Sequence, residues 1–127
     1  MAIAPGYANS AGTIFASAAR TATVNGDDIS NDDARGAIVV IDCTAVAATP
    51  SVVFTVQGKD PLSGKYYTIL TSTAITATGT TVLRIYPGLT AAANVTVSDI
   101  LPTVWRVIAT HGDADSITYT VGFMNLR

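Results

Sequence analysis

The chain has 127 residues, enough for one domain with a single hydrophobic core. Apolar residues make up 49% of it and charged residues only 13%, about half the usual share, which predicts that a partner covers part of the surface. With a net charge of −2 and no basic run, the sequence indicates no positively charged surface for binding nucleic acid.

All nine acidic residues are aspartates, and threonine, valine and isoleucine are abundant. Such a chain lacks the residues that build exposed helix faces, so the composition predicts an all-β domain. The one cysteine, Cys43, lies in an apolar run and is interpreted as a buried core residue. No apolar run approaches membrane-spanning length and no signal-peptide pattern is present, so we expect synthesis in a cytoplasm and no membrane partner.

At the N-terminus, small residues are mixed with Ile3, Pro5 and Tyr7 without any periodicity. This pattern predicts a short extended arm over residues 1–12, because such a segment buries too little apolar surface to fold by itself. The folded domain is expected to span residues 13–127.

A first strand is predicted over 13–24 from loose alternation, with Phe15 on the face opposite to Ile14. An acidic, turn-rich loop follows at 25–33. Its aspartates suggest calcium, but their spacing does not match the usual calcium loop and no glutamate completes a cage. A solvated connection is the favoured interpretation, and cation binding stays open.

The most apolar part of the chain lies within 36–67. Within 37–43, alternate positions on both faces are apolar until Asp42, which predicts a strand in the middle of a sheet or one that is covered on both faces. Residues 51–58 alternate with a period of two, and the turn signals at 59–65 precede a further strand from Tyr66. We expect two or three antiparallel strands here, at the centre of a β-sandwich.

In the C-terminal part, alternation predicts a strand over 80–86 that ends at a Pro-Gly turn. A strand over 103–110 contains Trp105, and 116–124 is predicted to be its hairpin partner across the polar turn 111–115.

These segments give seven or eight strands at spacings typical of sandwiches and barrels. The predicted fold is a single-domain antiparallel β-sandwich, Greek-key or jelly-roll-like, whose strand order the sequence leaves open. The expected core anchors are Val39, Ile41, Phe54, Trp105, Val107, Tyr119 and Val121.

Motifs for chemistry are scarce. His111, Asp113 and Asp115 occupy alternate positions of the last predicted turn and could present three ligand side chains. His111 is the only histidine of the chain, which excludes a zinc site with several nitrogen ligands. Neither a nucleophile elbow nor a phosphate-binding loop occurs. The sequence therefore predicts a protein without catalytic residues, cofactor or metal.

Three stretches resemble a family of small proteins encoded among the structural genes of tailed bacteriophages. They are VQGKDPLSGKYYTIL (56–70), LRIYPGLTAAAN (83–94) and LPTVWRVIATHGDADSITYTVG (101–122), and the resemblance covers roughly residues 13–124. It implies a virion component: a capsid decoration (cement) protein that stabilises the phage head through symmetric contacts. The alternative is a tail or fibre module that binds a host-surface carbohydrate or receptor.

The resemblance places the protein on the capsid surface of the virion. The implied partners are the major capsid protein and further copies of the chain, as a trimer or dimer. We expect the partner contacts in the arm and in the loops around 25–35 and 59–65, at Ile3, Pro5, Tyr7, Arg35, Lys59, Asp60 and Lys65.

A carbohydrate-binding module requires exposed aromatic side chains. Tyr66, Tyr67 and Tyr86 are the candidates, although adjacent residues of a strand point to opposite faces. An exposed Trp105 would serve as a sugar-stacking platform.

Overall fold

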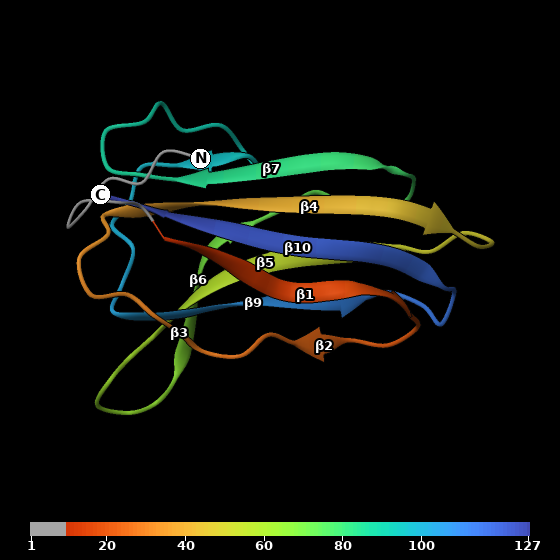
Figure 1. The fold of residues 1–127 in the computed structure, drawn as a ribbon, viewed down its shortest axis with the longest axis horizontal. Coiled ribbons are helices and arrows are strands. Elements are labelled where there is room, and N and C mark those ends of the chain that lie inside the picture. The colour runs from red at the N-terminus through yellow and green to blue at the C-terminus, as the bar shows by residue number, and fades with distance from the viewer. Residues whose placement is uncertain (1–9) are drawn as a thin grey trace.

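The computed structural model describes residues 10–127, which form ten strands and no helix (Figure 1). The all-β prediction is confirmed. The predicted arm contacts Ile3, Pro5 and Tyr7 lie outside the described residues. The first strand, β1 (Ala11–Arg20), begins within the range predicted for the arm.

The strands form two sheets, in which every pair is antiparallel except β7 with β8. Sheet A contains β1, β4 (Gly36–Val46), β7 (Gly79–Ile85), β8 (Thr96–Val97) and β10 (Ile117–Leu126). Sheet B contains β2 (Val24–Asn25), β3 (Ile29–Ser30), β5 (Val52–Lys59), β6 (Tyr66–Thr71) and β9 (Val104–His111). The order in sheet A is β1-β10-β4-β7-β8, and in sheet B it is β2-β9-β5-β6, with β3 also paired to β9.

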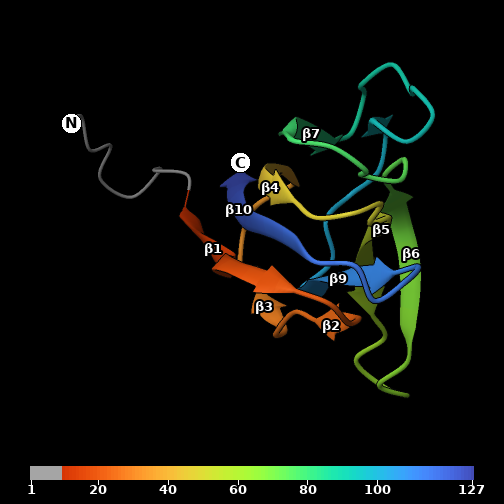
Figure 2. The same ribbon diagram turned by 90° about the vertical axis from the view of Figure 1, so that its right-hand side faces the viewer.

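One apolar core lies between the inner faces of the two sheets, which Figure 2 shows side by side. Tyr119 makes edge-to-face contacts with Phe15 and Phe54, and Trp105 makes one with Phe123. Because Trp105 is completely buried, it is not a sugar-stacking platform. The seven expected core anchors are at most 1% exposed: Val39, Ile41, Phe54, Trp105, Val107, Tyr119 and Val121.

The apolar run at 37–43 forms the middle of β4, which lies between β10 and β7 in sheet A. Its inward residues, such as Val39 and Ile41, are buried in the core. Ile38 and Val40 on the opposite face are partly exposed. The mid-sheet interpretation of this run is confirmed.

The predicted hairpin pairing of 103–110 with 116–124 is wrong. β9 lies in sheet B and β10 in sheet A, and β5 and β4 are divided between the sheets in the same way. The predicted turn after His111 is instead a link from sheet B to sheet A, where Gly112 N donates to Ser51 O and Ala47 N to Ser116 O. Period-two alternation shows which face of a strand is buried, and it does not show which sheet holds the strand.

The predicted strand over 13–24 is also divided, since β1 ends at Arg20 and the chain continues in sheet B as β2. The Arg20 guanidinium donates to the carbonyls of Ala16, Ala18 and Tyr119, and it lies 4.7 Å from the centroid of the Tyr119 ring. These contacts fasten the irregular end of β1 to β10.

Candidate functional site

The β5–β6 hairpin brings together three of the predicted partner contacts, Lys59, Asp60 and Lys65. β5 and β6 pair antiparallel, with Lys59 opposite Tyr66. Their connection, which we call the β5–β6 tip (residues 60–65), projects beyond the neighbouring strands in both ribbon views (Figures 1 and 2).

Hydrogen bonds within the β5–β6 tip fix its conformation. The Asp60 carboxylate accepts the backbone N–H of Leu62 at 3.0 Å and the Ser63 hydroxyl at 2.7 Å. The Asp60 N–H donates to Lys65 O, and the Asp60 carbonyl accepts from Gly64, whose φ of 74° suits glycine. The hydrogen bond from Ser63, followed by that from the Leu62 backbone, lowers the pKa of Asp60. Asp60 therefore orders the tip from within.

The ordered tip presents Leu62 to solvent. This side chain is 95% exposed, the highest value among the exposed large apolar residues of the described chain. Sequence reasoning missed it, because a single leucine among turn residues does not reveal its exposure. The Pro-Leu-Ser-Gly pattern of the turn was the only available signal.

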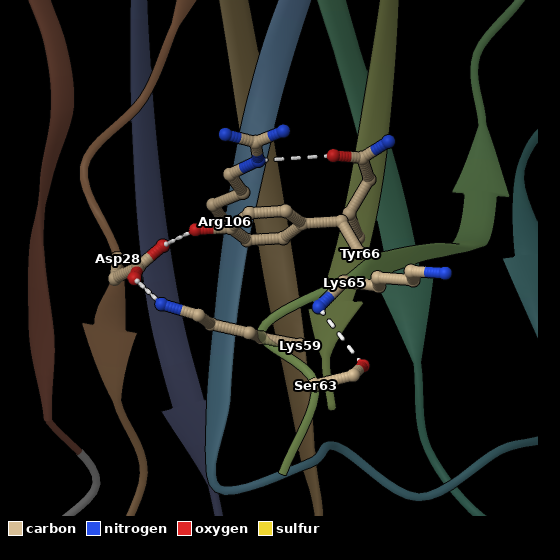
Figure 3. Close-up of polar contacts among 7 residues, drawn as sticks. Asp28, Lys59, Ser63, Lys65, Tyr66 and Arg106 are labelled. Carbon is tan, nitrogen blue, oxygen red and sulfur yellow. Dashed lines mark hydrogen bonds and ion pairs between the residues drawn. The ribbon is translucent and has the colours of Figure 1, made fainter. Parts of the chain in front are cut away.

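Below the tip, a polar cluster joins the hairpin to the rest of sheet B (Figure 3). We call Asp28, Gln57, Lys59, Tyr66 and Arg106 the hairpin-base cluster. Asp28 accepts the Tyr66 hydroxyl at 2.6 Å and the Lys59 ammonium at 2.9 Å. Arg106 Cζ lies 3.5 Å from the centroid of the Tyr66 ring, and Arg106 Nε donates to Gln57 at 2.9 Å.

Strand register explains why the hairpin-base cluster forms. Gln57 is opposite Arg106, and Lys59 is opposite Tyr66, so all four side chains lie on the outer face of sheet B. Asp28, from the acidic loop between β2 and β3, then reaches this face. Hydrogen bonds from Tyr66 and then from Lys59 lower the pKa of Asp28, and the bond to Asp28 raises the pKa of Lys59.

The cluster fits a role in positioning. Asp28 is engaged by Tyr66 and Lys59, and no nucleophile with an adjacent base occurs in it. Its bonds connect the segment 25–31, which contains Asp28 and β3, to the hairpin, across 38 positions in the case of Tyr66 and Asp28. The arrangement therefore holds the β5–β6 tip in one orientation relative to sheet B.

The remaining predicted contact, Arg35, lies apart from the hairpin. It precedes β4, where its backbone N–H donates to Leu126 O and its carbonyl accepts from Leu101. The structure therefore brings Lys59, Asp60 and Lys65 together and does not add Arg35 to them.

The three candidate tyrosines do not form one platform. Arg106 occupies a face of the Tyr66 ring. Tyr67 is 49% exposed and lies over Gly58, on the other side of the strand from Tyr66. Tyr86 follows β7 in sheet A and donates its hydroxyl to Arg127 O.

The last turn holds no cluster of ligands. His111 Nε2 lies 3.1 Å from the Tyr119 hydroxyl. Asp115 accepts the backbone N–H of Thr49, and Asp113 accepts that of Asp115. Within residues 10–127, no group of three His, Cys, Asp or Glu side chains is placed to hold a metal ion.

A polar pocket of about 220 Å³ lies beside the acidic loop. Asp33, one of its lining residues, forms an ion pair with Arg127. The Asn31 side-chain amide donates to the carbonyls of Ala34, Leu101 and Pro102, and its oxygen accepts the backbone N–H of Ala34. The lining residues are Ser10, Ser30, Asn31, Asp32, Asp33, Ala34, Asn125 and Arg127.

No protein-family model, curated protein or solved structure matches the chain. Among the residues that the structure covers, none belongs to a helix long and apolar enough to cross a membrane.

Proposed function

We propose that the chain is a non-enzymatic virion component of a tailed bacteriophage: a capsid decoration (cement) protein that binds the major capsid protein and further copies of itself. The observation that carries this proposal is the β5–β6 tip, an ordered projection with an almost fully exposed leucine. Contact of this kind stabilises an assembly without chemistry. The resemblance of residues 56–70, 83–94 and 101–122 to phage structural proteins supplies the biological setting.

We infer further that the two sheets form a jelly-roll β-sandwich. If β2 and β3 are counted as one strand and β8 is set aside, eight strands remain, in the order 1-8-3-6 in sheet A and 2-7-4-5 in sheet B. This alternation between sheets supports a double Greek key. Jelly rolls occur in viral capsid proteins and also in lectins, so the fold alone does not decide the function.

The β5–β6 tip is suited to bind an apolar pocket of the capsid. Burial of a fully exposed leucine contributes about 1.5–3 kcal/mol. Because hydrogen bonds to Asp60 already order the tip, little conformational entropy is lost on binding.

The copy number of this chain per purified virion tests the proposal. Quantitative mass spectrometry against the major capsid protein is expected to give a ratio of one or a simple fraction set by the symmetry of the shell. A handful of copies would favour the tail or fibre alternative. Absence from the particle would contradict a structural role in the virion.

A further inference from the structure

We propose that the outer face of sheet A pairs with the same face of a second copy of this chain, about a two-fold axis. This inference names the surface for the self-association that the proposed function includes. The charges and the strand register of β4, β7 and β10 support it.

The outer face of sheet A is open, and it is apolar around its centre, with threonines such as Thr80 and Thr120 beside Asp42. In Figure 2, sheet B lies on one side of sheet A, and no part of the chain within residues 10–127 covers the other side. Ile38, Val40 and Val82 are partly exposed on this face, and Met124 is 39% exposed. These side chains form an apolar centre that a second copy can cover.

Only two charged residues occur in β4, β7 and β10, namely Asp42 and Arg84. Asp42 is half-buried, and within the described part of the chain its one side-chain bond is a 3.4 Å contact from the Thr80 hydroxyl. The exposed Arg84 guanidinium has no hydrogen bond or ion pair with any residue from 10 to 127. The two charges are thus opposite in sign, and neither has an ionic partner among residues 10–127.

Strand register places these charges symmetrically about an apolar centre. Ile38 is opposite Arg84, Val40 is opposite Val82, and Asp42 is opposite Thr80. Arg84 and Asp42 therefore lie diagonally across the Val40–Val82 pair, about 4.8 Å apart across the strands and about 13 Å apart along them.

A two-fold axis in the plane of contact, passing over the Val40–Val82 pair, exchanges the two charged positions. Arg84 of each copy then faces Asp42 of the other, and the valines meet at the centre. The interface is isologous, because the same patch serves both copies. The line from Asp42 to Arg84 is inclined to the strand direction, so this two-fold axis makes the strands of the two copies cross at about 40°. That angle is close to the ~30° of aligned sheet packing.

The size of the face also suits a pair. Four strands of up to about ten residues, ~4.8 Å apart and rising ~3.3 Å per residue, cover on the order of 600 Å² before side-chain relief is counted. A stable interface buries about 800 Å² per partner. Sheet A supplies an area of that order without rearrangement of the backbone.

Charge reversal tests this pairing on the purified chain by analytical ultracentrifugation. The wild-type chain is expected to sediment as a dimer. Asp42→Arg alone, or Arg84→Asp alone, introduces two like-charge contacts per dimer, and each is expected to weaken dimerisation roughly tenfold or more. The double variant Asp42→Arg/Arg84→Asp restores both pairs and is expected to return the dimer.

Asp99→Arg is the matched control, because it changes the net charge by the same amount at an exposed position outside sheet A. Thermal melting of each variant checks that the fold is intact. A monomeric or trimeric wild-type chain, single variants that still dimerise, or a double variant that does not recover would each overturn the pairing. Since no virion enters this experiment, its result is independent of the copy-number test of the proposed function.

Discussion

The guanidinium of Arg106 lies on the ring of Tyr66, and the hydroxyl of that tyrosine is bonded to Asp28. The tyrosine therefore contacts a cation through its ring and an anion through its oxygen. This links β9, β6 and the loop between β2 and β3, three segments that are distant in sequence. The orientation of the β5–β6 hairpin depends on this contact, because Tyr66 is at its base.

Tyr66→Phe separates the two functions of this tyrosine. The phenylalanine ring can still lie under Arg106, whereas the hydrogen bond to Asp28 is lost. We expect faster hydrogen exchange in the loop between β2 and β3, around Asp28, with unchanged exchange in the core strand β9. Tyr67→Phe is the matched control, since it removes a neighbouring hydroxyl that faces away from the cluster. Equal protection of the loop in Tyr66→Phe and wild type would contradict the role of the Asp28 bond.

Trp105 is expected to be the largest single contributor to the core. It is completely buried, lies opposite Gly58 in the β5–β9 pair and contacts Phe123 edge to face. Trp105→Ala should lower the free energy of unfolding by roughly 3–5 kcal/mol, because the cavity cannot close fully. Denaturant titration measures the loss, and an unchanged midpoint would contradict the packing. Trp105→Phe is expected to cost less, because it retains a ring and also removes a buried Nε1 for which residues 10–127 provide no hydrogen-bond acceptor.

The strands of the core could be predicted from sequence because burial on one face imposes a period of two. In β9, Trp105, Val107 and Ala109 are buried, as their alternation indicates. The assignment of strands to sheets could not be predicted in this way. Both β9 and β10 present an apolar row to the same core, and a row that faces the core from one side has the same pattern as one that faces it from the other.

The candidate site was predictable only in part. Turn residues marked the β5–β6 connection, so Lys59, Asp60 and Lys65 were placed correctly on one hairpin. Asp28 was interpreted as part of a solvated acidic loop, whereas it bonds to Tyr66 and Lys59. Such a contact depends on how the sheets bring distant segments together, and no local pattern encodes it.

Leu62→Ser tests the β5–β6 tip as the capsid contact. Because Leu62 is 95% exposed, the substitution should change the free energy of unfolding by no more than about 0.5 kcal/mol. Binding to virions that lack the protein should weaken roughly tenfold to a hundredfold, the equivalent of a buried leucine side chain. Ile100→Ser, at a site 66% exposed outside the hairpin, is the control and should bind normally. Equal binding by the Leu62→Ser and wild-type chains would exclude the tip from the contact.

Stability is expected to fall at both ends of the pH range through one pair of residues, His111 and Tyr119, which are in contact through Nε2 and the hydroxyl. Burial lowers the pKa of His111 below its usual 6.5, with a smaller contribution in the same direction from Arg20 and an opposing one from Asp113. The folded state thus favours neutral imidazole. Its stabilising contribution is complete above pH 6.5 and is lost as the pH falls from there through the lowered pKa of the folded state.

At the alkaline end, burial raises the pKa of Tyr119 to about 12. The folded state favours the protonated phenol, so this contribution is complete below pH 10 and is lost as the pH rises from 10 to about 12. Urea titrations across the pH range measure both losses of stability: the acid limb, which we assign to His111, and the alkaline limb, which we assign to Tyr119. His111→Gln should flatten the acid limb between neutrality and the pH region where Asp28 and Asp60, whose pKa values lie below 3.8, begin to protonate. Tyr119→Phe should flatten the alkaline limb alone, and a variant that altered the opposite limb instead would contradict the assignment of these two groups.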